Sequence, residues 1–272
     1  SQDKHFATNH EYAFAYSKSI LPKGFFSIEK EEDQIEEEYP EEDELGKYRL
    51  LELRNTHREF GKHNRKNMYF PLFVNTKGEV STNPDEGEKV LPIWDDGFEG
   101  CWTWGEPKAI NEIELLAGKK IDGRWKIYRK SYANGAERML KTILSEKTFF
   151  TERGQKEFGQ LFKTKAKIFQ SPKSPFFVIE LLKTCTHNQD IVLDFFAGSG
   201  TTAEAVMRLN AEDGGQRQFI LVQIPQPIDP KKQKEAHTFV KETLGKSEAT
   251  IFEITVERLR RAVEDSAEGR VS

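Results

Sequence analysis

Apolar runs in the last third of the chain predict an alternation of strands and helices. Residues 191–193 form a short apolar run that predicts a buried strand. Residues 202–209 have the apolar spacing of a helix, which Gly214 and Gly215 would end. Residues 218–224 predict a second buried strand, which Pro225 and Pro227 interrupt. This order of strand, helix and strand predicts an α/β fold.

Further helices are expected on both sides of these strands. Residues 175–186 predict a helix with Ser174 at the N-cap and Pro175 in its first turn. Residues 231–244 and 250–264 predict two more helices, separated by Gly245. Near the other end of the chain, residues 11–16 have a strand-like pattern.

The middle of the chain has a different pattern. Between residues 46 and 159, short apolar runs are separated by turn signals at residues 75–78, 83–85 and 95–97. Residues 122–129 predict a turn followed by a strand. We therefore expect a small α+β domain here, inserted into the α/β fold.

Charge is segregated around the start of this domain. Residues 29–44 are mostly acidic, and such a block repels itself, which predicts a solvated loop or linker. Basic residues crowd into the next twenty or so positions. The net charge of the whole chain is −4, so any nucleic-acid contact surface must be local.

Composition restricts the class of protein. The 272 residues include 32% charged residues, and the mean hydropathy is −0.69, which predicts a soluble protein. No apolar run is long enough for a membrane span, and the first residues lack the pattern of a signal peptide. Cys101 and Cys185 lie far apart, and the six histidines have no ligand spacing, so we expect neither disulfides nor a metal site.

The segment between the two predicted strands carries the strongest functional signal. Gly198 and Gly200 allow a sharp turn and a close approach of the backbone to a ligand. The start of the following helix suits a carboxylate or a phosphate. Ser199, Thr201 and Thr202 could donate hydrogen bonds to such a group, or could simply cap the helix. The glycines also fit the dinucleotide pattern G-x-G-x-x-A, so a nicotinamide or flavin enzyme and an ordinary tight turn are alternatives.

The order Asp194-x-Phe196-x-Gly198-x-Gly200 resembles the S-adenosylmethionine-binding motif of DNA amino-methyltransferases. With the segments at residues 169–175 and 254–262, the chain resembles the C-terminal half of Type III restriction-modification Mod subunits, which are beta-class adenine-N6 methyltransferases. The resemblance implies part of a Rossmann-like methyltransferase sheet with an inserted α+β target-recognition domain. It also implies S-adenosylmethionine as cofactor, double-stranded DNA as substrate, a homodimer, a possible restriction (Res) subunit, and a bacterial cytoplasmic location.

The resemblance assigns roles to individual residues. The cofactor-binding residues would be Phe169, Pro172, Lys173, Asp194, Phe195, Phe196, Ala197, Gly198, Ser199, Gly200, Thr201, Thr202 and Gln223. Gln223 departs from the family pattern, because an acidic residue commonly binds the ribose hydroxyls at this position. The DNA-binding residues would be Arg65, Lys66, Asn67 and Tyr69, where basic and aromatic side chains alternate. Trp102 and Trp104 are more often core residues than base-stacking ones.

The same resemblance divides the chain into four parts. Residues 1–28 would contain the terminal strand of the catalytic sheet, and residues 29–45 an acidic linker. Residues 46–160 would form the target-recognition domain, and residues 161–272 the cofactor-binding part of the methyltransferase domain.

The second signature of amino-methyltransferases, a polar residue followed by Pro-Pro and an aromatic residue, is missing from the sequence. In the beta class it precedes the variable region, so we expect it before Ser1, in a longer protein of which this chain is a fragment. No residue of this chain is therefore assigned a catalytic role, and we expect the isolated chain to be inactive. A non-catalytic, methyltransferase-like module that binds DNA or a partner is the alternative.

Overall fold

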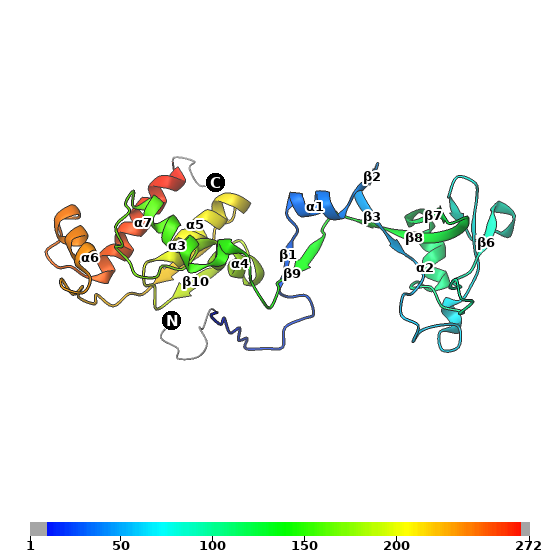
Figure 1. The fold of residues 1–272 in the computed structure, drawn as a ribbon, viewed down its shortest axis with the longest axis horizontal. Helices are drawn as coiled ribbons and strands as arrows, with labels where there is room; N and C mark the ends of the chain where they lie inside the picture. Colours follow the sequence, from blue (N-terminus) through cyan, green and yellow to red (C-terminus); the bar gives the residue numbers. More distant parts are fainter. Residues whose placement is uncertain (1–9, 268–272) are drawn as a thin grey trace. The chain divides into compact units, whose positions relative to one another are not determined.

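The computed structural model describes residues 10–267, and these residues form two compact units (Figure 1). Of the described residues, unit 1 comprises residues 10–28 and 139–267, and unit 2 comprises Glu29–Arg138. The chain passes between the units along two short strands that pair with each other, β1 (Ser27–Glu29) and β9 (Glu137–Met139). Unit 2 is thus an insertion, but it begins and ends earlier than the predicted range of residues 46–160.

Unit 1 contains the predicted strand–helix–strand segment. Strands β10 (Ile191–Asp194) and β11 (Gln218–Leu221) are parallel, and α5 (Thr201–Asp213) connects them. Helix α4 (Pro175–Cys185) begins after Ser174 with Pro175 in its first turn, as predicted. Apolar residues of α4 and α5 pack against one face of the two strands, where Val192 and Phe219 lie in register.

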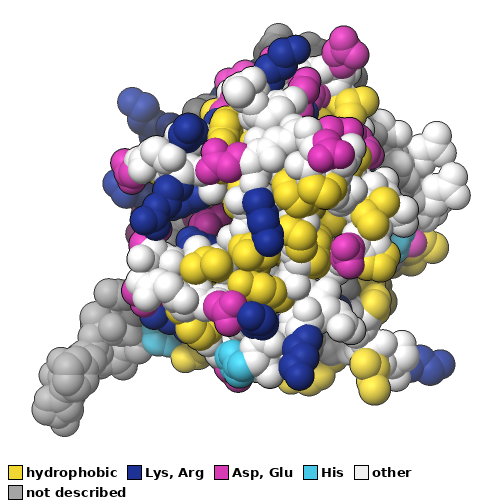
Figure 2. Space-filling model, turned by 90° about the vertical axis from the view of Figure 1, so that its right-hand side faces the viewer, with side chains coloured by type: hydrophobic (Ala, Val, Ile, Leu, Met, Phe, Trp, Pro, Cys, Tyr) yellow, Lys and Arg dark blue, Asp and Glu magenta, His cyan; other side chains and the backbone are white. Residues whose placement is uncertain are grey.

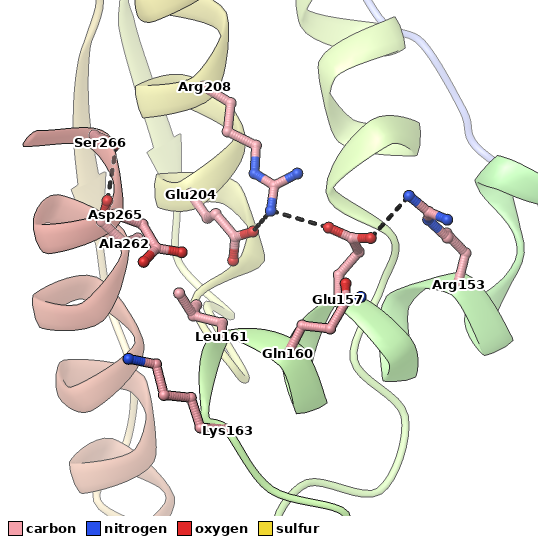
Figure 3. Close-up of a pocket in the computed structure, with 10 residues that line it drawn as sticks. All are labelled: Arg153, Glu157, Gln160, Leu161, Lys163, Glu204, Arg208, Ala262, Asp265 and Ser266. Carbon is pink, nitrogen blue, oxygen red and sulfur yellow. Dashed lines mark hydrogen bonds and ion pairs between the residues drawn. The ribbon is translucent and has the colours of Figure 1, made fainter. Parts of the chain in front are cut away.

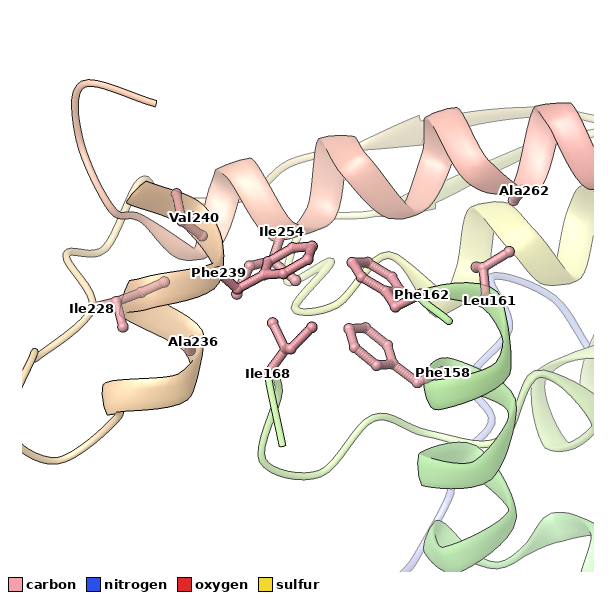
Figure 4. Close-up of a cluster of buried hydrophobic side chains, with 10 residues drawn as sticks. All are labelled: Phe158, Leu161, Phe162, Ile168, Ile228, Ala236, Phe239, Val240, Ile254 and Ala262. Atoms are coloured by element: carbon pink, nitrogen blue, oxygen red, sulfur yellow. The ribbon is translucent and has the colours of Figure 1, made fainter. Parts of the chain in front are cut away.

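The remaining helices of unit 1 enclose a second core, shown in Figure 4. Helix α3 (Thr151–Leu161) contributes Phe158, whose ring stacks on Phe162 at a centroid distance of 4.1 Å. Helix α7 (Ile251–Ala267) contributes the fully buried Ile254. The helix predicted at residues 231–244 is present as the short α6 (Lys234–Thr238), which continues as a π-helical turn, η5 (Phe239–Thr243). Helix α3 thus belongs to unit 1, although residues up to 160 were predicted to belong to the inserted domain.

Unit 2 contains two small antiparallel sheets. The four-stranded sheet has the order β2 (Glu41–Asp43), β3 (Gly46–Glu52), β8 (Arg124–Tyr132), β7 (Leu116–Ile121). The three-stranded sheet has the order β5 (Val80–Ser81), β4 (Leu72–Val74), β6 (Glu88–Val90). Unit 2 also contains two helices, α1 (Glu32–Glu38) and α2 (Glu106–Asn111), and three 3-10 turns, η1 (Lys66–Met68), η2 (Pro84–Glu86) and η3 (Ile113–Leu115). A further 3-10 turn, η4 (Lys147–Phe149), lies in unit 1. Unit 2 is therefore a mixture of short helices and antiparallel strands.

The core of unit 2 is built around Trp102. Its side chain is buried, and its indole Nε1 donates a hydrogen bond of 2.8 Å to the carbonyl oxygen of Phe70. Trp104 lies partly buried beside the same core, and the ammonium group of Lys108 lies 4.6 Å from the centre of its ring. Both tryptophans therefore have the predicted core positions.

The acidic block differs from the prediction of a solvated linker, because it forms α1 and β2. Basic side chains from neighbouring strands offset its self-repulsion. Arg49 donates to Glu38 at 2.8 Å, and Lys130 donates to Asp43 at 2.6 Å. Hydrogen bonds from Lys30 and Lys130 hold the pKa values of Glu38 and Asp43, respectively, below their usual range. A sequence pattern shows the run of acids but not the basic partners that pairing brings to it.

The strand predicted at residues 11–16 is absent, and Tyr12 and Tyr16 are exposed. A strand needs a neighbour for its backbone hydrogen bonds, and residues 10–20 pair with no other strand of the described chain. Residues 1–9, the beginning of the part predicted at residues 1–28, lie outside the described residues. A place for this segment in a larger catalytic sheet stays a prediction about the whole protein.

Candidate functional site

The turn between β10 and α5 has the backbone that its glycines predict. Gly198 and Gly200 have φ angles of +53° and +81°, in the left-handed region that favours glycine. The amide of Gly200 donates to the carbonyl oxygen of Ala197 at 2.7 Å, which closes the turn immediately before α5 begins. The start of α5 therefore directs its first backbone N–H groups toward the turn.

Asp194 organises this turn from the end of β10. Its carboxylate accepts a hydrogen bond from the backbone amide of Phe196 at 3.0 Å and another from the hydroxyl of Thr202 at 2.6 Å. Thr202 is thus tied to Asp194, and its hydroxyl is not free for a ligand in this structure. The bond to the amide two residues later gives the aspartate the local geometry of an Asx turn.

Ser199 and Thr201 face the interior of unit 1, with exposed fractions of only 3% and 6%. The guanidinium group of Arg258, on α7, donates from the same nitrogen, Nη1, to both hydroxyl oxygens, at 2.7 Å for Ser199 and 2.8 Å for Thr201. The hydroxyls were predicted to meet a carboxylate of the ligand or to cap the helix. Here they bond within the protein, and no side-chain hydrogen bond caps α5. The turn can therefore offer a ligand its backbone more readily than these two hydroxyls.

Gln223, two residues beyond the end of β11, is also tied to the turn. Its side-chain oxygen accepts from the backbone amide of Gly198 at 2.7 Å, and its side-chain nitrogen donates to the carbonyl oxygen of Ile224 at 2.9 Å. One residue earlier, the carbonyl oxygen of Val222 accepts from the amide of Ala197 at 3.1 Å. To contact the ribose as predicted, the side chain of Gln223 would have to break one of these two hydrogen bonds, or use the same atom for both the bond and the ribose hydroxyl.

The loop at residues 169–173 lies against the same turn. The end of the Phe169 ring lies 3.6 Å from the position that a Cβ atom on Gly198 would take. The carbonyl oxygen of Lys173 accepts a long hydrogen bond of 3.5 Å from Thr201. Pro172 is buried, and the exposed ammonium group of Lys173 pairs with Glu11. The fold thus brings together the three segments that were predicted to bind the cofactor: the loop, the turn and the end of the second strand.

The two parallel strands expose one apolar face. Ile191 and Leu193 are 62% and 57% exposed, and Ile220, in register with Leu193, is 53% exposed. The sequence predicted buried strands, but only the face that α4 and α5 cover is buried. Phe195 and Phe196 are exposed in the turn beyond β10, and Phe196 reaches 80%. Parallel sheets are normally covered on both faces, so this face has the composition of a surface that is buried in a larger assembly.

A cavity of about 420 Å³ lies between α3, α5 and α7, but none of the predicted cofactor residues lines it (Figure 3). Acidic and basic side chains alternate along its wall. Arg208 contacts both Glu204, at 2.7 Å, and Glu157, at 3.0 Å, and Arg153 contacts Glu157 at 2.9 Å. These charges compensate one another within the protein, so the cavity has no surplus of one sign to attract a charged ligand.

Sequence reasoning missed Arg258, which is fully buried, and its partner Glu204. A signal was present. Ile251, Ile254 and Ala262 define an apolar stripe with helical spacing, and Arg258 lies in the middle of that stripe. A charged residue at such a position needs a buried partner, which predicts an acidic residue on a neighbouring helix.

The predicted DNA-binding residues lie in unit 2, at and beside η1. Lys66 and Asn67 are exposed within η1. The guanidinium of Arg65 lies 4.9 Å from the centre of the Phe60 ring. The Tyr69 hydroxyl donates to Glu99 at 2.8 Å, and burial together with Glu99 raises the pKa of Tyr69 to about 12.

Acidic residues lie close to this basic segment. Glu99 also accepts from Lys62 at 2.7 Å, and Asp96 pairs with Arg58 at 2.7 Å. The guanidinium of Arg58 lies 4.6 Å from the centre of the Trp94 ring. Figure 2 shows basic and acidic side chains interspersed on one face of the molecule, without a uniform basic field. A phosphate bound near η1 would therefore contact single basic side chains, and would not lie in a uniformly basic surface.

Two kinds of feature are absent from the described part of the chain. Between residues 10 and 267, no group of three histidine, cysteine or carboxylate side chains is placed to hold a metal ion. Within the same range, no helix has the length and apolarity to cross a membrane.

Comparison with known proteins gives a consistent family. Residues 1–230 match the family described as DNA methylase. The chain is 33% identical over 276 aligned residues to the Type III restriction-modification enzyme EcoPI Mod subunit of Escherichia phage P1, with 96% of this chain and 40% of that protein covered. It is 32% identical over 261 residues to the Type II methyltransferase M.KpnI of Klebsiella pneumoniae, with 94% of this chain and 58% of that protein covered. A third relative, the StyLTI Mod subunit of Salmonella typhimurium, is 37% identical over 166 residues, which cover 60% of this chain and 24% of that protein. The chain thus spans about half the length, or less, of these relatives.

Proposed function

The chain belongs to the DNA methylase family, and we propose that it forms the cofactor-binding part of an enzyme that methylates adenine N6 in a short DNA sequence. The proposed methyl donor is S-adenosylmethionine. The observation that carries the proposal is the convergence of the loop at residues 169–173, the glycine turn and Gln223 at one end of two parallel strands. Ligands of α/β sheets bind at the carboxyl ends of the strands.

The chemistry assigned to these residues is binding and orientation. S-adenosylmethionine carries an activated methyl group, so catalysis rests on holding donor and acceptor in line. The backbone at the start of α5 would hold the carboxylate of the donor. The exposed rings of Phe195 and Phe196 would pack beside its methionine part or against the target nucleotide. The groups that polarise the adenine amine would come from the Pro-Pro signature outside this chain.

The exposed apolar face of β10 and β11 supports the proposal that this chain supplies the cofactor-binding part and the rest of the whole protein supplies the catalytic part. We propose that the rest of a Rossmann-like sheet, with its second helical layer, covers this face in the whole protein. The two relatives matched along nearly all of this chain contain residues beyond the aligned part, since only 40% and 58% of their lengths are covered. In this arrangement, residues 10–20 gain a pairing partner that they lack here.

The decisive experiment measures methyl transfer by the whole protein. Labelled S-adenosylmethionine is incubated with duplex DNA, and the product nucleoside is identified by mass spectrometry. N6-methyladenine confirms the proposal, and another methylated base overturns the adenine assignment. The isolated chain, assayed beside it, should incorporate no label above a control without enzyme.

Calorimetry separates the cofactor classes. We expect the isolated chain to bind S-adenosylmethionine or its demethylated product weakly, because the Pro-Pro signature, which would form part of the pocket wall, is not in its sequence. NAD serves as the competitor, since the glycine pattern also fits a dinucleotide enzyme. Equal or tighter binding of NAD would refute the assignment.

We propose that unit 2 recognises the DNA target, with Arg65 and Lys66 contacting phosphates and Asn67 and Tyr69 beside them. The exposure of Lys66 and Asn67 in η1 supports this role. If the contacts are to phosphates, the change of Arg65 and Lys66 to alanine weakens binding about equally for all sequences. It also lowers the salt slope by roughly 0.9 per lost contact.

A matched control keeps the charge change constant. Lys89 and Lys119 are exposed strand residues of the same unit, and changing both to alanine removes two positive charges elsewhere. The control should leave the salt slope nearly unchanged. If both double variants lower the slope equally, the effect is one of net charge, and the DNA contact lies in another segment.

The relatives differ in how they are described, which leaves two forms of the proposed enzyme. Two of the three are named Mod subunits of Type III restriction-modification enzymes, and we propose this form, with a restriction subunit as partner and a homodimeric whole protein in the bacterial cytoplasm. M.KpnI is named a Type II methyltransferase, which favours a methyltransferase that acts alone as the second candidate. Co-purification of the whole protein with the product of a neighbouring restriction gene distinguishes the two.

A further inference from the structure

Arg258 is fully buried in α7, yet it contacts the glycine turn more than fifty residues earlier in the chain. Its Nε atom donates to the carboxylate of Glu204, on α5, at 2.7 Å. Its Nη1 atom donates to the hydroxyls of Ser199 and Thr201, which themselves lie 3.1 Å apart. One side chain therefore holds both the residue between the two glycines and the first residue of the helix.

Two neighbours of Arg258 on α7 contact the same turn. The hydroxyl of Thr255 donates to the carbonyl oxygen of Gly198 at 2.6 Å. A Cβ atom on Gly200 would lie 3.0 Å from Leu259 Cδ1, so the helix packs directly against the glycine. Residues 255, 258 and 259 share one face of α7, because they are three and four positions apart. This face forms a surface against which the turn is fixed.

Stability alone is a weak reason for this arrangement. A buried ion pair loses the hydration of both charges, and apolar residues of similar volume commonly replace such a pair without loss of stability. The Nη2 atom of Arg258 is buried without a hydrogen-bond partner, which adds to that cost. What the pair provides is direction, since a guanidinium group fixes several acceptors in one plane.

We propose that Arg258 is a positioning residue for the cofactor, which acts by holding Ser199 and Thr201 so that the backbone of the turn faces the ligand. This inference rests on the proposed function and adds a residue to its site. The hydroxyls of Ser199 and Thr201 support the turn from behind, and the cofactor carboxylate is bound by backbone N–H groups. Glu204 keeps the guanidinium in place and offsets its charge.

Arg258→Lys, made in the whole protein, tests the proposal. Lysine can keep the ion pair with Glu204, but its single nitrogen cannot also occupy the position of Nη1, the second nitrogen, which donates to both hydroxyls. The matched control is Arg208→Lys, because Arg208 contacts the other oxygen of the same carboxylate, at 2.7 Å, and lines the cavity between α3, α5 and α7 (Figure 3). Both variants disturb the buried Glu204, and the control also disturbs Glu157, but only Arg258→Lys disturbs the turn.

Two measurements decide the outcome. Hydrogen exchange without cofactor should be about tenfold faster at the amides of residues 198–202 in Arg258→Lys than in Arg208→Lys. The dissociation constant for S-adenosylmethionine should rise about tenfold in Arg258→Lys and less than about twofold in the control. Melting temperatures measured alongside separate this effect from a general loss of stability. Equal exchange and equal affinity in the two variants would overturn the proposal.

The double variant Ser199→Ala with Thr201→Val provides a second test that leaves the ion pair intact. If Arg258→Lys does not fold, exchange at residues 198–202 in the double variant decides alone, and unchanged exchange overturns the proposal. If Arg258 acts through the hydroxyls, this variant reproduces the loss of affinity, and adding Arg258→Lys causes no further loss. If the hydroxyls contact the cofactor directly, the double variant weakens binding whereas Arg258→Lys alone does not. That result would overturn the proposal.

The exchange measurement also keeps the two ideas separate. If the whole protein binds no S-adenosylmethionine, the proposed function fails. In that case, unchanged exchange at residues 198–202 overturns the role of Arg258 as well, whereas faster exchange preserves its role as the support of the turn for whichever ligand binds there.

Discussion

Replacement of Gly200 by alanine tests how tightly α7 confines the glycine turn. Gly200 has a φ angle of +81°, and a side chain in the left-handed region costs about 1–2 kcal/mol. The new methyl carbon would also lie 3.0 Å from Leu259 Cδ1 and 3.3 Å from Thr255 Cγ2. Favourable contacts between carbon atoms lie at about 3.5–4.0 Å, and overpacking of this kind adds about 1–3 kcal/mol. We therefore expect a total loss of about 2–5 kcal/mol of stability, the sum of these two ranges.

Gly214→Ala is the matched control. Gly214 ends α5 with a φ angle of +70°, and nothing lies within 4 Å of a Cβ atom placed there. Its replacement therefore has the backbone cost alone, about 1–2 kcal/mol. The entropy that alanine removes from the unfolded chain is the same for both variants and cancels in the comparison. The difference between the two variants measures the contact with α7.

The distribution of tryptophan provides the assay. All four tryptophans, at positions 94, 102, 104 and 125, lie in unit 2, whereas both glycines lie in unit 1. Urea unfolding followed by far-ultraviolet circular dichroism reports both units, and tryptophan fluorescence reports unit 2. The dichroism transition of Gly200→Ala should move to lower urea than that of Gly214→Ala, while the fluorescence transition stays in place. Equal shifts for the two glycines would falsify the idea that α7 confines the turn.

Three further predictions concern individual side chains. Glu99→Gln should lower the pKa of Tyr69 from about 12 toward its usual range, because the carboxylate is one cause of the increase; ultraviolet titration, with Tyr69→Phe as reference, measures this pKa. The part of stability linked to neutral Tyr69 is present below about pH 10 and is lost as the pH rises through about 12. Trp102→Phe should cost about 2–4 kcal/mol, because it leaves a gap in the core of unit 2 and a buried carbonyl without its 2.8 Å hydrogen bond; an unchanged urea midpoint would contradict the burial of the indole. Arg260 and Arg261 keep the pKa of Glu257 below its usual range, so the associated stability is present above pH 4.5 and is lost as the pH falls. Glu257→Gln should therefore make the stability of unit 1 less sensitive to acid, and an identical acid transition in the two proteins would refute this.

Much of unit 1 was predictable because its signals are local. The apolar run of β10, the two glycines and the period of α5 follow one another within about twenty residues, and each agrees with the next. Ser174 and Pro175 marked the start of α4, and Gly214 marked the end of α5. Where propensity, spacing and turn chemistry point to the same element, the sequence specifies it.

The features that escaped prediction depend on contacts between distant residues. Strand β3 pairs with β8 about eighty positions later, and no local pattern reveals that partner. The same pairing brings Lys130 to the acidic block and turns an expected linker into part of a domain. In unit 1, the contact of Arg258 with Ser199 and Thr201 joins two segments whose patterns are ordinary when each is taken alone. No local pattern in either segment therefore reveals that these two hydroxyls bond within the protein.

The chain enters and leaves unit 2 through the paired strands β1 and β9. The backbone amide of Lys30 donates to the carbonyl oxygen of Ala136 at 3.0 Å, and that of Leu140 donates to Phe26 at 2.9 Å, so the chain leaves and returns within one hydrogen-bonded ladder. More than a hundred residues can therefore be exchanged for another sequence, or replaced by a tight turn, without altering the spacing of the two strands. In evolutionary terms, such a junction would let the inserted unit diversify or be lost without a change in the strand–turn–helix segment of unit 1.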